Sequence, residues 1–215
     1  MPVVNISAAV NRPLLVSRGR RLERLTIAWN SFEAVVALVS GVMAGSIALV
    51  GFGLDSVIET TSAVILLWRL RADADRASRE RAELTARRLV GACFVLLALY
   101  VAAESVHALW IKAQPERSLP GILIAVAAIV VMPMLGRAKR RVAAQLQSRA
   151  LEADSRQADF CAYLSAILLA GLLLHALLGW WWADPAAGLV MVPIIAREGV
   201  QGLRGEACDD CACGG

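Results

Sequence analysis

The amino-acid sequence predicts an all-α membrane protein with six transmembrane helices and both termini in the cytoplasm. Hydrophobic residues make up 58% of the 215 residues, and the mean hydropathy is +0.61. Soluble domains contain roughly 45–50% apolar residues. Several segments hold about 20 mostly apolar residues, which is the length that crosses a bilayer as a helix. Lys and Arg gather in alternate connections between these segments, and this pattern indicates their orientation.

Six apolar segments are long enough for such helices, and we expect the helices over residues 25–44, 46–69, 89–110, 119–136, 153–178 and 180–202. Short connections join the first segment to the second and the fifth to the sixth, which predicts two antiparallel hairpins. The third segment follows a long basic connection. Pro133 in the fourth segment and Pro193 in the sixth each predict a kink.

Basic residues place both ends of the chain on one side of the membrane. Of the 22 Lys and Arg residues, only Lys112 and Arg117 fall in connections on the opposite side. Because basic connections stay in the cytoplasm, we expect both termini there, in a multi-pass protein of the plasma membrane. This distribution accounts for the net charge of +4 without a nucleic-acid partner.

The chain divides into a basic cytoplasmic segment, residues 1–23, a six-helix domain, residues 24–204, and a Cys-rich cytoplasmic tail, residues 205–215. In the first part the arginines follow a weak apolar run, which is the wrong order for a cleaved signal peptide. The tail carries Cys208, Cys211 and Cys213. Closely spaced cysteines in a reducing cytoplasm bind metal more often than they form disulfides. A tail without a function is the alternative.

Two acids, Asp55 and Glu59, lie near the middle of the second helix. A charge at this depth costs roughly 2.5–3.5 kcal/mol on insertion scales. The spacing of four residues puts both acids on one face of the helix. They repel each other when both are ionised, and a divalent cation bound between them removes that repulsion. A shared proton is the other solution, and hydrogen bonds to Ser or Thr of neighbouring helices are a third.

The fifth helix brings a second pair of polar side chains to the same depth. Gln157 and Cys161 are four residues apart, so they share a face, and Asp154 lies one turn before Gln157 on that face. Asp159 is about 200° from Gln157 around the helix and points elsewhere. Two pairs from two helices predict a four-ligand, roughly tetrahedral metal site. A cysteine alone is also a common small buried hydrophobe.

Other polar residues fall within the predicted helices. Asn30 and Glu33 lie on the first helix at the depth of Glu59, where either a place in the same cavity or an interhelical hydrogen bond would explain them. Glu104 and His107, near the outer end of the third helix, fit an interfacial pair better than a proton relay.

These residues resemble the pattern of the cation diffusion facilitators, which are six-helix exporters of divalent metals. In that family a Ser of the second helix is followed after nine and thirteen residues by two acids, here Ser46, Asp55 and Glu59. The fifth helix carries an Ala-Asp frame followed by two ligands. The resemblance implies a homodimer that exchanges metal for protons, with a transport site of Asp55, Glu59, Gln157 and Cys161.

The sequence departs from that pattern in three ways. Glu59 replaces the usual second Asp of the pair, and Gln157 and Cys161 replace a His and an Asp. A thiolate favours Zn, Cd, Cu(I) or Fe over Mn and Mg. Asp154 or Glu33 is a candidate for the missing carboxylate. Because the sixth helix is followed only by the Cys-rich tail, we expect a short form without the soluble C-terminal domain that family members often carry.

The sequence thus predicts a secondary transporter that exports a divalent cation, zinc foremost, in exchange for protons. We expect no cofactor, because the metal is the cargo. No nucleophile with an adjacent base and no nucleotide motif indicates an enzyme. The alternative function is a membrane-bound metal sensor or scaffold that uses the Cys tail and does not transport.

Overall fold

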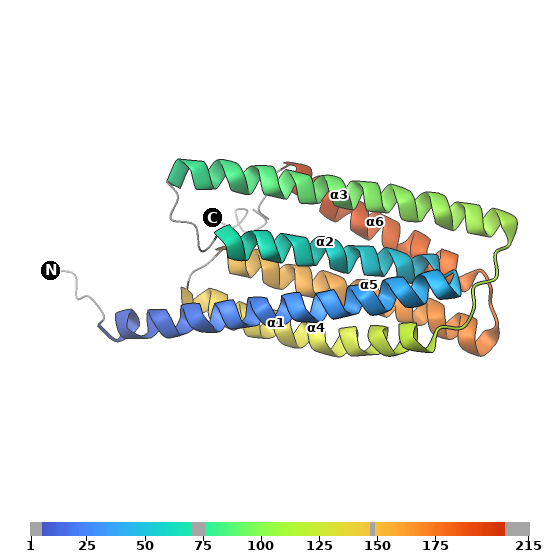
Figure 1. Ribbon diagram of the computed structural model, residues 1–215, viewed down its shortest axis with the longest axis horizontal. Coiled ribbons are helices and arrows are strands. Elements are labelled where there is room, and N and C mark those ends of the chain that lie inside the picture. Colours follow the sequence, from blue (N-terminus) through green and yellow to red (C-terminus); the bar gives the residue numbers. More distant parts are fainter. Residues whose placement is uncertain (1–5, 70–75, 147–148, 205–215) are drawn as a thin grey trace, which may run out of the picture.

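The computed structural model describes residues 6–69, 76–146 and 149–204, which form six helices in a single bundle (Figure 1). The helices are α1 (Ile6–Ala44), α2 (Ile47–Arg69), α3 (Arg76–Ile111), α4 (Leu119–Leu146), α5 (Arg149–Leu178) and α6 (Ala183–Arg204). All six are long and apolar enough to cross a membrane. The predicted fold class of six transmembrane helices is therefore confirmed. The tail cysteines Cys208, Cys211 and Cys213 lie outside the described residues.

Three helix boundaries were predicted wrongly, because the predictions stopped where the apolar runs stop. α1 begins at Ile6 rather than near residue 25, α3 begins at Arg76 rather than near residue 89, and α4 continues to Leu146 rather than ending near residue 136. Arg and Ala recur in all three extensions, and both are good helix formers. The helices consequently continue beyond the predicted apolar cores.

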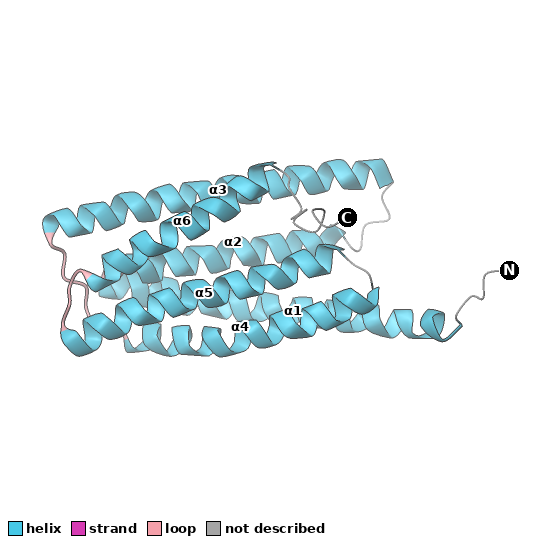
Figure 2. Cartoon of the chain, turned by 180° about the vertical axis from the view of Figure 1, so that it is seen from behind, coloured by secondary structure: helices cyan, strands magenta, loops and turns pink. Residues whose placement is uncertain are grey.

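The helices pack mainly in three pairs, α1 with α2, α3 with α6 and α4 with α5, and Figure 2 shows them running nearly parallel to one another. α2 also contacts α3, α5 and α6, so it lies at the centre of the bundle. α1 begins and α6 ends on the same side of the bundle (Figure 1), as an even number of antiparallel passes requires.

A Schellman motif ends α1 and makes the first hairpin tight. Gly45 has a φ of 64°, the left-handed conformation that glycine adopts without a Cβ clash. The Gly45 N–H donates to the Val42 carbonyl at 3.3 Å, and the Ser46 N–H donates to the Gly41 carbonyl at 2.9 Å. The Ser46 hydroxyl then accepts from the Leu49 N–H at 3.2 Å, which caps the start of α2.

Asp184, at the start of α6, holds this hairpin to the last helix. Its carboxylate accepts a hydrogen bond from the Ser46 hydroxyl at 2.5 Å and another from the Ile47 N–H at 2.9 Å. Asp184 is 1% exposed. A buried carboxylate is tolerated here because N–H and O–H donors surround it.

Close backbone contact joins α3 and α6. A Cβ at Gly91 would lie 2.6 Å from the Leu203 nitrogen and 2.7 Å from the Gly199 carbonyl oxygen. Both are backbone atoms, which cannot move away without shifting a helix. Glycine at this position therefore sets the distance between the two helices.

We expect Gly91→Ala to lower the free energy of unfolding by about 1–3 kcal/mol through overpacking. The measurement is thermal unfolding in detergent. Gly19→Ala is the matched control, because its Cβ would have no neighbour nearer than 3.8 Å and alanine is the better helix former. Equal unfolding temperatures for Gly91→Ala and the wild type would contradict the close contact of α3 with α6.

Candidate metal site

Three potential metal ligands meet between α2 and α5 in the middle of the bundle. Asp55, Glu59 and Cys161 each offer one ligand atom, and these atoms all lie within 4.8 Å of one another. Asp55 and Cys161 are 0% exposed, and Glu59 is 4% exposed. Asp55 and Glu59, whose four-residue spacing predicted a shared face of α2, thus both lie close to Cys161 of α5. We call Asp55, Glu59 and Cys161 the central cluster.

The central cluster is short of hydrogen-bond donors. Both carboxylate oxygens of Asp55 and one of Glu59, Oε1, are buried without a hydrogen-bond partner among the described residues. A buried polar group without a partner costs about 1–3 kcal/mol, and more when it is charged. Two neighbouring carboxylates with three free oxygens form an arrangement that a cation would stabilise.

The dimensions of the central cluster suit a small divalent cation. Zinc binds carboxylate oxygen at about 2.0–2.2 Å and thiolate sulfur at about 2.3 Å. Ligand atoms around one tetrahedral ion then lie roughly 3.3–3.8 Å apart. Separations within 4.8 Å need only small side-chain rotations to reach that range.

Glu33 on α1 lies directly beside the central cluster. Its carboxylate accepts hydrogen bonds from the Ser56 hydroxyl at 2.6 Å and from the Trp29 indole N–H at 2.9 Å. The Cys161 thiol lies 3.6 Å from Glu33 Oε1 and donates to it. Glu33 is 0% exposed. It therefore holds the Cys161 sulfur in place, and its own oxygens already have donors.

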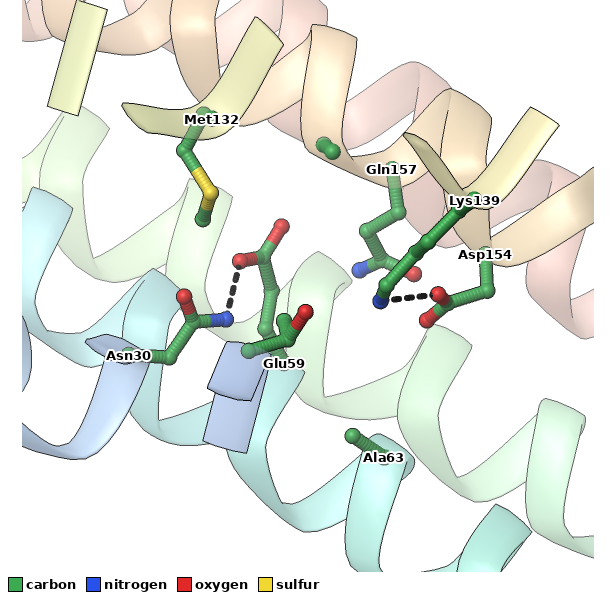
Figure 3. Close-up of a pocket in the computed structure, with 9 residues that line it drawn as sticks. Asn30, Glu59, Ala63, Met132, Lys139, Asp154 and Gln157 are labelled. Carbon is green, nitrogen blue, oxygen red and sulfur yellow. Dashed lines mark hydrogen bonds and ion pairs between the residues drawn. The ribbon is translucent and has the colours of Figure 1, made fainter. Parts of the chain in front are cut away.

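A small pocket opens beside Glu59 (Figure 3). Asn30 donates to Glu59 Oε2 at 2.8 Å on one side. Gln157 and Asp154 lie on the opposite side with Lys139 (Figure 3). The Gln157 amide nitrogen is buried and has no hydrogen-bond partner within residues 6–69, 76–146 and 149–204. Gln157 thus faces Glu59 across the pocket, and its role as a ligand stays a prediction.

Asp154 does not join the central cluster. Its carboxylate forms an ion pair with the Lys139 ammonium, so a cation already neutralises it. Asp159 points away from the pocket, as predicted. It forms a bidentate ion pair with Arg140, with nitrogen–oxygen distances of 2.5 and 2.9 Å. Glu104 is half-buried and His107 is exposed, and neither belongs to the central cluster.

Lys139 is a buried polar residue beside the pocket that the sequence prediction missed. It was counted among the basic residues of a cytoplasmic connection, yet it is 1% exposed within α4. A helical stripe runs through Ala128, Met132 and Gly136 and continues through Lys139 to Ala143, all of them buried. Extending this periodicity beyond the apolar run would have placed Lys139 inside the bundle.

The chain thus has the form of a helical membrane protein with potential metal ligands buried between its helices. A sequence model of the cation efflux transmembrane domain matches residues 24–205. The chain belongs to the cation efflux family, whose members are transporters, and this supports transport of a divalent cation.

Three relatives illustrate the similarity. Transmembrane protein 163 of Xenopus laevis is 28% identical over 89% of this chain and 73% of its own length. The cadmium, cobalt and zinc/H(+)-K(+) antiporter of Bacillus velezensis is 24% identical over 77% of this chain and 54% of its own. Cation-efflux pump FieF of Shewanella oneidensis is 29% identical over 77% of this chain and 57% of its own. The chain therefore spans little more than half the length of these two bacterial relatives.

We expect Asp55→Asn to raise the thermal unfolding temperature in the presence of a chelator. The amide removes one of two neighbouring charges and adds a donor, which together stabilise by roughly 1–2 kcal/mol. Asp184→Asn is the matched control. It should lower the unfolding temperature, because Asp184 is a buried acid that already has donors. A lower unfolding temperature for both variants would contradict the lack of hydrogen-bond donors at Asp55.

Proposed function

We propose that this chain exports divalent transition-metal cations, zinc foremost, from the cytoplasm in exchange for protons. The single observation that carries the proposal is the central cluster, in which three of the four carboxylate oxygens are buried without a hydrogen-bond partner among the described residues. Membership of the cation efflux family supports the same class of cargo. In this proposal the protein is a secondary transporter of the plasma membrane and acts as a homodimer.

The chemistry of the ligands favours zinc and cadmium. Asp55 and Glu59 supply hard oxygens, and Cys161 supplies a soft sulfur. Sites that mix thiolate with oxygen favour zinc and softer metals over Mn and Mg. A relative whose name gives cadmium, cobalt and zinc as its cargo is consistent with this choice. Gln157 is our proposed source of the fourth ligand, because its side chain lies across the pocket from Glu59, and a rotation of its amide would turn the carbonyl oxygen toward the central cluster (Figure 3).

Proton exchange follows from the same ligands. A carboxylate or a thiol binds metal only after it loses its proton, so metal binding releases protons and protonation expels metal. The central cluster can therefore hold a cation in one conformation and protons in the other. Alternating access to the two sides of the membrane would make these two states a transport cycle.

The test is metal flux into proteoliposomes that contain a zinc-sensitive dye, with and without a pH gradient. We expect Asp55→Asn to reduce proton-dependent zinc flux by at least 100-fold, because it removes a charged ligand. Asp159→Asn is the matched control on the exposed surface of α5, and it should keep wild-type flux.

Deleting residues 205–215 separates the two candidate functions. An exporter with its site in the bundle keeps its flux without the tail. A sensor or scaffold that uses Cys208, Cys211 and Cys213 would give no metal flux in the full chain or in any variant. Cooperative thermal unfolding of the same samples would show that the protein is folded. That result would overturn the export proposal.

A further inference from the structure

A buried lysine lies between the central cluster and the end of the bundle where α4 meets α5. Lys139 is 1% exposed, as is Glu23 of α1. The Lys139 ammonium lies 3.4 Å from Glu23 Oε2 and forms a second ion pair with Asp154. The Lys139 ammonium of α4 thus pairs with one acid from α1 and one acid from α5.

This ion-pair group is not balanced in charge or in hydrogen bonds. Two carboxylates share one ammonium, and Glu23 Oε1 is buried with no hydrogen-bond partner in the described part of the chain. Burial of an ion pair is costly, and a well-packed apolar set often gives equal or greater stability. Stability alone therefore does not account for the presence of these three charges.

The same pocket connects the lysine to the proposed transport site. Lys139, Asp154 and Gln157 lie on one side of the pocket, and Glu59 with Asn30 lies on the other (Figure 3). A cation held by Glu59 would be in the field of the Lys139 ammonium through a region of low dielectric constant. Charges of the same sign repel strongly under these conditions.

We propose that Lys139 is a tethered counter-cation that lowers the affinity of the central cluster for its metal. While the cluster is empty, the ammonium offsets part of the negative charge around the pocket. After a divalent cation binds, the ammonium repels it and so promotes release. The inference rests on the proposed function, because it needs a metal at the central cluster.

A transporter gains from such a residue. Asp55, Glu59 and a thiolate together carry three negative charges, which could hold zinc too tightly for rapid turnover. A fixed positive charge weakens binding without removing a ligand, whereas losing a ligand would also abolish selectivity. Lys139 acts through the field at the site and touches no ligand atom of the central cluster in this structure, so it is a positioning residue.

The experiment measures zinc binding by calorimetry and zinc flux in proteoliposomes for the same variants. We expect Lys139→Met to lower the Kd for zinc about tenfold, as loss of a nearby like charge predicts. Turnover at saturating zinc should fall by a similar factor, and KM should fall with it. Lys139→Arg keeps the charge and should remain near the wild type in Kd.

Arg140→Met is the matched control. Arg140 is the next residue of α4 and pairs with Asp159 of α5, but this pair is exposed. Arg140→Met should leave Kd, KM and turnover unchanged. If it tightens zinc binding as much as Lys139→Met does, a general surface-charge effect explains both and the inference is wrong.

A second variant covers the case in which Lys139→Met does not fold. Glu23→Gln keeps the shape of the side chain and removes one of the two carboxylates that neutralise the ammonium. It should raise the Kd for zinc several-fold, whereas Asp159→Asn, the exposed equivalent, should not. An unchanged or lower Kd for Glu23→Gln would overturn the inference.

Asp55→Asn, measured alongside, distinguishes the two proposals. If it binds zinc as the wild type does, the central cluster is not the site, and both the proposed function and this inference fail. If Asp55→Asn loses binding while Lys139→Met leaves the Kd unchanged or raises it, the inference alone fails.

Discussion

Acidic groups buried with few hydrogen-bond partners between α1, α2 and α5 are the constraint on which the rest of the structure depends. Asp55 is completely buried, and within the part of the chain that the structure describes neither of its carboxylate oxygens has a hydrogen-bond partner. Among the described side chains, Glu59 has one donor, the Asn30 amide. In a membrane-spanning bundle no bulk solvent supplies what is missing. The surrounding helices must therefore provide countercharge, or the acids must take up protons or a mobile cation.

The buried acids fall into distinct groups according to their partners. Asp184 accepts from Ser46 and from the Ile47 backbone and thereby fixes the start of α2 to the start of α6. Asp154 and Glu23 have an ammonium. Asp55 has neither donor nor cation among the described residues. Asp184 stabilises the fold. In our proposals, the Lys139 group adjusts the charge around the pocket, and Asp55 binds the transported cation.

Much of this arrangement could be predicted from the sequence, because the membrane restricts what a chain can do. Apolar length gave the six helices, and the four-residue spacing of Asp55 and Glu59 gave the shared face, which Cys161 was predicted to meet from the fifth helix. The helix ends were not predictable from hydropathy, since Arg-rich and Ala-rich segments continue a helix after the apolar run ends. Lys139 was missed for the same reason. Whether Gln157 reaches the metal depends on a side-chain rotation that a one-dimensional pattern does not contain.

Close packing explains why the central cluster can be held in a defined geometry. Gly91 lets the backbones of α3 and α6 approach closely, and the Asp184 contacts tie the α1–α2 hairpin to α6. α2 contacts four other helices, so the two acids that it carries are positioned from several sides. A relative movement of α2 and α5 would change the distance between Asp55 and Cys161. It would therefore change the affinity of the central cluster for a cation.

The most direct test of the central claim is X-ray absorption spectroscopy of the zinc-loaded protein, with Cys208, Cys211 and Cys213 replaced by Ser. We expect one sulfur ligand at about 2.3 Å from the zinc, together with oxygen or nitrogen ligands at about 2.0–2.2 Å. The sulfur signal should disappear in Cys161→Ser. Zinc bound without sulfur in the protein that retains Cys161, or a sulfur signal that survives Cys161→Ser, would contradict the claim that one cation bridges α2 and α5 at the central cluster.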